Sequence, residues 1–113
     1  MTASDRLARW GPVIAWAAVI FAFSSVSNLS TGLGTWDLVL RKLAHLTEYA
    51  ILGGLAYRAA GRVWVAVAFG SLYAVTDELH QAFVEGRVAS PVDWALDTVG
   101  VVAGVLLVAR ALR

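Results

Sequence analysis

The chain has 113 residues, of which 59% are hydrophobic and 15% charged, and its formal net charge is +1. Soluble domains average about 45–50% apolar and about 25% charged residues, so this composition is typical of a membrane protein. The small net charge and the lack of a basic run argue against nucleic acid as a partner, and the absence of cysteine excludes disulfides and thiolate chemistry. The length suffices for one domain, which we assign to residues 1–113.

Four segments are long and apolar enough to cross a bilayer, which requires about 20 mostly apolar residues. In chain order, the predicted spans cover residues 10–28, 38–57, 63–83 and 92–112. Because the connections 58–62 and 84–91 are short, neighbouring spans are expected to run antiparallel. We therefore expect an all-α fold, a four-helix transmembrane bundle.

The first span has an alternative interpretation. Arg6 and Arg9 followed by an apolar stretch also fit a cleaved signal peptide. The apolar run is longer than a usual signal-peptide core, however, and no A-x-A cleavage site follows it. These features favour a retained span.

The positive charges predict the orientation of the spans. The N-terminus, the 58–62 turn and the C-terminus carry Arg6, Arg9, Arg58, Arg62, Arg110 and Arg113. These three segments share one side of a four-span chain, and positively charged segments stay in the cytoplasm, which predicts an N-in, C-in topology. On this basis we expect a multi-pass protein of the bacterial cytoplasmic membrane.

Ionisable side chains collect in the outer half of the predicted bundle. The second span carries Lys42, His45 and Glu48 within about a third of the helix circumference, with Tyr49 on the same side. The third span carries Asp77, His80 and Gln81 on one stripe, with Glu78 off its edge, and the fourth carries Asp93 and Asp97. Ser24 ends the first span on the same side. The inner halves contain no acid and no histidine.

Lipid cannot surround these groups. A charge at the bilayer centre costs about 2.5–3.5 kcal/mol on insertion scales, so five or six of them would cost roughly 15–20 kcal/mol. That exceeds or equals a typical folding stability of about 5–15 kcal/mol. The polar stripes are therefore expected to face one another inside the bundle.

Several readings of these residues compete. The set Lys42, His45 and Glu48 could be an interhelical clamp that only fixes packing. Asp77-x-x-His80 and the reversed pair His45-x-x-Glu48 resemble metal-ligand pairs of soluble bundles, but without cysteines or an established ligand pattern we expect no metal and no other cofactor. Asp93 could cap the fourth helix together with Ser90 or belong to the site, and we interpret Gly100-x-x-x-Gly104 as a packing motif.

Three stretches, FSSVS, KLAHLTEYAILG and DELHQAFVEGRVASPVDWALDTVGVVAG, together resemble the VanZ-like family of small bacterial membrane proteins. The residues that carry the resemblance are Lys42, His45, Glu48, Tyr49, Asp77, Glu78, His80, Gln81, Phe83, Gly86, Arg87, Ser90, Asp93, Asp97 and Gly100. Glu85 stands where the family usually has proline. The family is named for resistance to the glycopeptide teicoplanin, so the resemblance implies a role in the cell envelope at the outer face of the membrane.

These observations lead to one functional hypothesis. The outward-facing pocket is expected to bind, and could modify, a membrane lipid or a lipid-linked envelope precursor. Lys42 and Arg87 would hold an anionic headgroup, and Asp77 with His80 or His45 would act as general base or proton shuttle. Glu48, expected to be the most buried acid, could be the general acid. The remaining predicted substrate-binding residues are Tyr49, Gln81, Asp97 and Ser24.

Two other classes of protein fit the same residues. An accessory or assembly protein would use the polar layer only for folding and partner recognition. A small proton- or ion-coupled carrier would need polar residues that continue to the inner face, which the apolar inner halves do not provide. The sequence does not decide whether the protein is an enzyme, and a second copy of the chain could complete the pocket.

Overall fold

The computed structural model describes residues 2–24, 35–83 and 91–112, without the side chains of residues 24 and 35–38. The described residues form four α-helices: α1 (Ala3–Ser24), α2 (Thr35–Ala60), α3 (Val63–Ala82) and α4 (Pro91–Ala111). The expected all-α class is confirmed. The predicted spans lie within or close to these helices, except for residues 25–28 and the 84–90 part of the second connection, which lie outside the described residues.

Helix α1 begins at Ala3 rather than at residue 10, because a capping box starts it. The Thr2 hydroxyl accepts a hydrogen bond from the Asp5 N–H (3.1 Å), and the Asp5 carboxylate accepts one from the Thr2 N–H (3.1 Å). Such reciprocal bonds satisfy backbone donors that a helix start leaves without partners. The apolar pattern does not reveal this polar first turn, which precedes the hydrophobic segment.

The connection between α2 and α3 is shorter than expected. Helix α2 continues to Ala60, so that only Gly61 and Arg62 separate it from Val63. Gly61 has a φ of +76°, and its N–H donates to the Tyr57 carbonyl at 2.8 Å. A glycine in this left-handed conformation ends a helix without steric cost, which lets α3 fold back along α2 at once.

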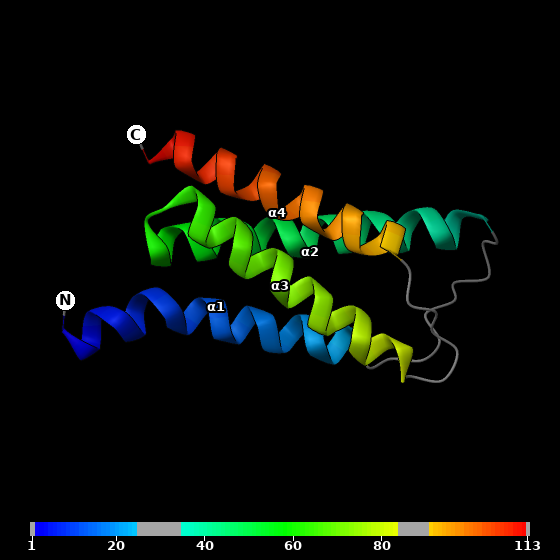
Figure 1. The fold of residues 1–113 in the computed structure, drawn as a ribbon, viewed down its shortest axis with the longest axis horizontal. Helices are drawn as coiled ribbons and strands as arrows, with labels where there is room; N and C mark the ends of the chain where they lie inside the picture. The colour runs from blue at the N-terminus through cyan, green and yellow to red at the C-terminus, as the bar shows by residue number, and fades with distance from the viewer. Residues whose placement is uncertain (1, 25–34, 84–90, 113) are drawn as a thin grey trace.

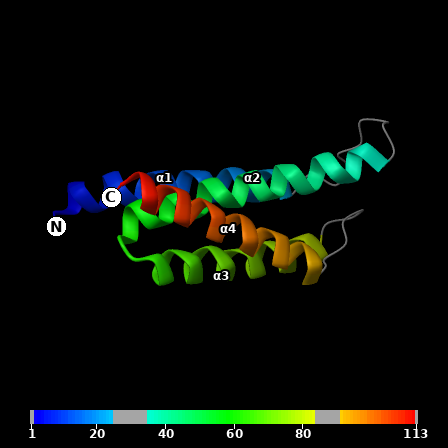
Figure 2. The ribbon, with the colours of Figure 1, turned by 90° about the horizontal axis from the view of Figure 1, so that it is seen from above.

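The helices form an antiparallel bundle with two distinct ends (Figure 1). The chain ends and the α2–α3 turn lie at one end, whereas the start of α2, the end of α3 and the start of α4 lie at the other, as the view from above also shows (Figure 2). Helix α2 packs against all three of the other helices and most extensively against α4.

Glycines allow α2 and α4 to approach closely. A Cβ atom at Gly100 would lie 2.6 Å from the Leu46 carbonyl oxygen, and one at Gly104 would collide with the Ala50 carbonyl. Small residues at helix crossings let backbones touch in this way. The packing interpretation of Gly100-x-x-x-Gly104 is confirmed.

The outside of the bundle is strongly apolar. Large hydrophobic side chains on all four helices are exposed, among them Ile14 (67%), Ile51 (41%), Leu72 (66%) and Leu107 (68%). By length and composition, two helices could cross a membrane, at Ala3–Phe23 and Pro91–Ala111. Helices α2 and α3 also expose large hydrophobic side chains, as Ile51 and Leu72 show.

Candidate functional site

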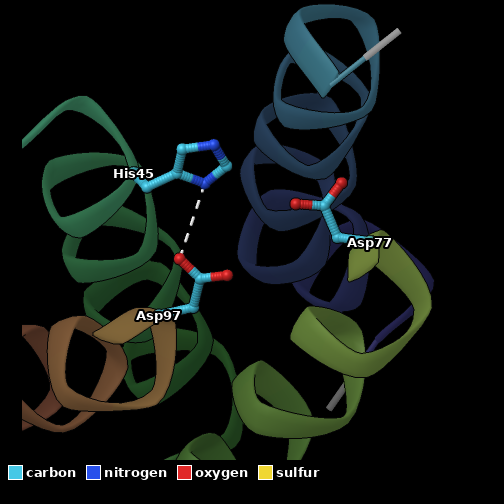
Figure 3. A group of neighbouring side chains, drawn as sticks. All are labelled: His45, Asp77 and Asp97. Carbon is cyan, nitrogen blue, oxygen red and sulfur yellow. Dashed lines mark ion pairs between the residues drawn. The ribbon is translucent and has the colours of Figure 1, made fainter. Parts of the chain in front are cut away.

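Three helices bring His45, Asp77 and Asp97 together in the interior of the bundle. His45 lies on α2, Asp77 on α3 and Asp97 on α4, and Figure 3 shows their side chains converging on one space between the helices. His45 Nδ1 lies 3.5 Å from Asp97 Oδ1. One ligand atom from each of the three residues lies within 4.8 Å of the others. We call these three residues the polar triad.

The two carboxylates of the polar triad are deeply buried. Asp97 has an exposed fraction of 0% and Asp77 of 3%. The expectation that Glu48 is the most buried acid is wrong, because the Glu48 side chain is only half-buried. Glu78 also differs from expectation: it is 8% exposed and belongs to the buried face of α3 rather than to its edge.

Two donors fix the orientation of Asp77. The Tyr49 hydroxyl donates to Asp77 Oδ2 at 2.9 Å, and Gln81 Nε2 donates to the same oxygen at 3.3 Å. Tyr49 is completely buried, and Gln81 is 3% exposed. Both residues were predicted to bind substrate, and in the structure their side chains contact Asp77.

Other acceptor atoms of the polar triad remain unfilled within the described part of the chain. Asp77 Oδ1 and both carboxylate oxygens of Asp97 accept no hydrogen bond there, and His45 Nδ1 makes none. The separation of 3.5 Å between His45 and Asp97 exceeds the usual hydrogen-bond range of about 2.7–3.2 Å. Buried polar atoms almost always have a partner in the protein, in ordered water or in a bound ion, so these atoms are candidates for contacts with a bound species.

A comparison with protein families identifies the family of this chain. The VanZ/LLP1 family model matches residues 6–112. The chain belongs to the VanZ/LLP1 family. The resemblance inferred from the sequence is thereby confirmed. No curated protein and no solved structure matches the chain.

The Lys42 side chain of this VanZ family member is paired. Lys42 Nζ lies 2.9 Å from Asp93 Oδ1, and the side chains are 39% and 34% exposed. The pair joins the N-terminal halves of α2 and α4, about one helical turn from His45 and Asp97. Asp93 therefore acts in a contact between helices, while its predicted capping partner Ser90 lies outside the described residues.

Of the remaining predicted site residues, Glu48 and His80 contact helix α1, and the side chains of two others lie outside the described residues. The His80 ring stacks on Phe21 of α1, with ring centroids 4.2 Å apart and an interplanar angle of 8°. The backbone carbonyl of Glu48 accepts a hydrogen bond from Trp16 Nε1 at 2.8 Å. Arg87 and the side chain of Ser24 lie outside the described residues.

Sequence reasoning separated two residues that the structure joins. Asp97 was grouped with the substrate-binding residues and His45 with the catalytic ones, whereas their side chains face each other across the α2–α4 contact. The position of Asp97 in the sequence already indicated a role other than capping, because Asp97 lies too deep in its helix to act as an N-terminal cap. The helical pattern alone could not identify His45 as its neighbour.

Proposed function

We propose that this protein is a four-span membrane protein whose outward-facing polar pocket binds a membrane lipid or a lipid-linked precursor of the cell envelope. Membership of the VanZ family suggests a membrane protein tied to cell-envelope or resistance functions. In this proposal, residues 1–113 form one domain, and both chain ends lie in the cytoplasm.

One observation carries this proposal: the polar triad holds unfilled buried acceptors inside a bundle whose surface is apolar. Ionisable groups at membrane depth are costly, and those that persist usually mark a functional site. A polar clamp that only fixed the packing would be expected to satisfy its own hydrogen bonds, as Lys42 and Asp93 do.

The residues of the pocket differ in the role we assign to them. Lys42 lies at the partly exposed rim, where an ammonium group can attract an anionic headgroup or phosphate. His45 and Asp77 lie deeper, and a histidine next to a carboxylate can take up and release a proton near neutral pH. The pocket thus has the residues for binding at its rim and for proton transfer in its interior.

Native mass spectrometry of the protein released from its own membrane tests the proposal. We expect a phosphate-bearing lipid adduct on the wild type, reduced at least fivefold in Asp77→Asn. Asp5→Asn is the matched control, because Asp5 lies in the first turn of α1 at the opposite end of the bundle. Equal adducts on the folded Asp77→Asn protein, or no adduct on any variant, would favour an accessory role in which the polar layer only supports packing.

A further inference from the structure

The polar triad offers a set of ligand atoms in which the nitrogen of one imidazole faces the oxygens of two carboxylates. His45, Asp77 and Asp97 come from three different helices, and their ligand atoms lie within 4.8 Å of one another. The set crosses between helices, unlike the i, i+3 pairs that the sequence suggested. We propose that the polar triad binds one divalent transition-metal ion, such as Zn²⁺ or Mn²⁺.

The distance between His45 and Asp97 supports this inference. A tetrahedral Zn²⁺ ion with bonds of about 2.0–2.2 Å holds its ligand atoms roughly 3.4 Å apart. The observed separation of 3.5 Å between Nδ1 and Oδ1 matches this value, although it is long for a hydrogen bond. His45 and Asp97 are thus already spaced as two ligands of one ion, and Asp77 offers a carboxylate oxygen within 4.8 Å of the other two ligand atoms.

The surroundings of Asp77 are those of a metal ligand. Tyr49 and Gln81 both donate to Oδ2, whereas Oδ1 accepts no hydrogen bond from the described residues. Metal-binding carboxylates are commonly held in this way, with one oxygen bonded to neighbouring donors and the other left for the ion. The two donors therefore orient Asp77 before any ion arrives.

Charge balance favours a divalent cation over a proton. Asp77 and Asp97 are both buried, and Lys42, at the rim, is paired with Asp93. A protonated His45 could neutralise only one of two ionised carboxylates, whereas a divalent ion neutralises both. One nitrogen and two oxygen ligands suit a transition metal better than Ca²⁺ or Mg²⁺, which prefer sites made of oxygen atoms alone. Three protein ligands leave a coordination position open, as in catalytic metal sites.

Metal binding is tested with delipidated, chelator-treated full-length protein in detergent, so that the result does not depend on the proposed lipid. We expect the wild type to bind one equivalent of Zn²⁺ or Mn²⁺ by titration calorimetry and elemental analysis. Bound Co²⁺ should give the visible absorption of a four- or five-coordinate ion. Asp97→Asn and His45→Gln should weaken binding at least 100-fold.

Two control variants sharpen the test. Asp93→Asn makes the same change one helical turn before Asp97, and His80→Gln removes the other histidine of the polar layer. Both variants leave the three proposed ligands in place, so each should lose far less metal affinity than Asp97→Asn and His45→Gln do. The proposal is overturned if the folded wild type binds no stoichiometric metal, or if Asp93→Asn loses as much affinity as Asp97→Asn. A wild-type protein that binds no metal overturns the proposal even if a variant fails to fold.

The lipid and metal experiments fail independently of each other. Metal binding without a lipid adduct would remove the lipid proposal and leave the metal site in place. A lipid adduct on protein that binds no metal would do the reverse, and would leave His45 and Asp97 as an ion pair within a lipid pocket.

Discussion

Asp93 and Asp97 lie one turn apart on α4, yet their carboxylates are in different environments. The Asp93 side chain is 34% exposed and paired with Lys42, whereas Asp97 is fully buried beside His45. The same residue type therefore serves as a contact between helices at the rim and as a member of the polar triad inside. Partial exposure lets water reduce the strength of the rim pair, while the buried carboxylate has no such relief.

A double-mutant cycle on Lys42→Met and Asp93→Asn measures the strength of the rim pair. Because each of the two side chains is more than a third exposed, we expect a coupling free energy of about 0.2–1 kcal/mol. The measurement is the free energy of unfolding in detergent for the wild type, both single variants and the double variant. A coupling well above this range would show that the pair is shielded from water in the folded protein.

For single residues, the sequence predicted which polar side chains face the interior of the bundle, but not how they pair. Helical spacing correctly put Lys42, His45, Asp77 and Asp97 on inward stripes. It could not predict that Lys42 reaches Asp93 while His45 faces Asp97, because such pairing depends on the crossing of α2 and α4 and on side-chain rotamers. The burial of Glu78 was missed for the same reason, since the width of the buried face depends on its neighbours.

The contact between α2 and α4 is the most extensive helix contact among the described residues, and it depends on glycines. Gly53 and Gly54 on α2, and Gly100 and Gly104 on α4, all face atoms of the opposite helix. The spacing of Gly100 and Gly104 predicted a packing motif, but the sequence did not indicate which helix it would meet. That these glycines lie in the same helix contact as Gly53 and Gly54 of α2 is visible only in the three-dimensional structure.

Gly104→Ala should disrupt this contact. The added Cβ would collide with the Ala50 carbonyl, and backbone atoms cannot move aside as a flexible side chain can. We expect a loss of about 1–3 kcal/mol in the free energy of unfolding, measured in detergent. Loss of the close crossing should also displace Asp97 from His45.

Gly11→Ala is the matched control, because a Cβ at Gly11 has no atom within 4 Å. The gain in helix propensity there is about 1 kcal/mol, and the steric restriction on a residue before Pro12 opposes it. The net effect should be small. If both variants were equally destabilised, the close approach of α2 and α4 would not be the cause.

Across the whole molecule, five arginines and the polar triad lie at opposite ends, while Arg41 and Lys42 lie on the part of α2 nearer the triad. Arg58, Arg62 and Arg110 lie at the end that holds the chain termini, as do Arg6 and Arg9. The polar triad lies toward the other end, near the start of α4 and the end of α3. This separation supports the proposed orientation, with the arginines in the cytoplasm and the polar pocket facing outward.

Cysteine labelling in intact cells tests this orientation. The chain contains no cysteine, so a single introduced thiol is the only one. Phe83→Cys, at an 89% exposed position at the end of α3, should react with a membrane-impermeant maleimide. Arg62→Cys, in the exposed turn between α2 and α3, should react only after the cells are permeabilised. The reverse pattern would show that the protein has the opposite orientation in the membrane. Labelling of both positions in intact cells would contradict the four-span arrangement.

The origin of the polar triad on three helices has a thermodynamic consequence. No hairpin of two neighbouring helices contains all three side chains, so the site exists only after α2, α3 and α4 have assembled. Any ligand that requires all three residues binds the folded chain and not the unfolded one. By mass action such a ligand stabilises the bundle by about 2.7 kcal/mol when its free concentration is 100 times its dissociation constant. Occupancy of the site and persistence of the fold are thus one linked equilibrium.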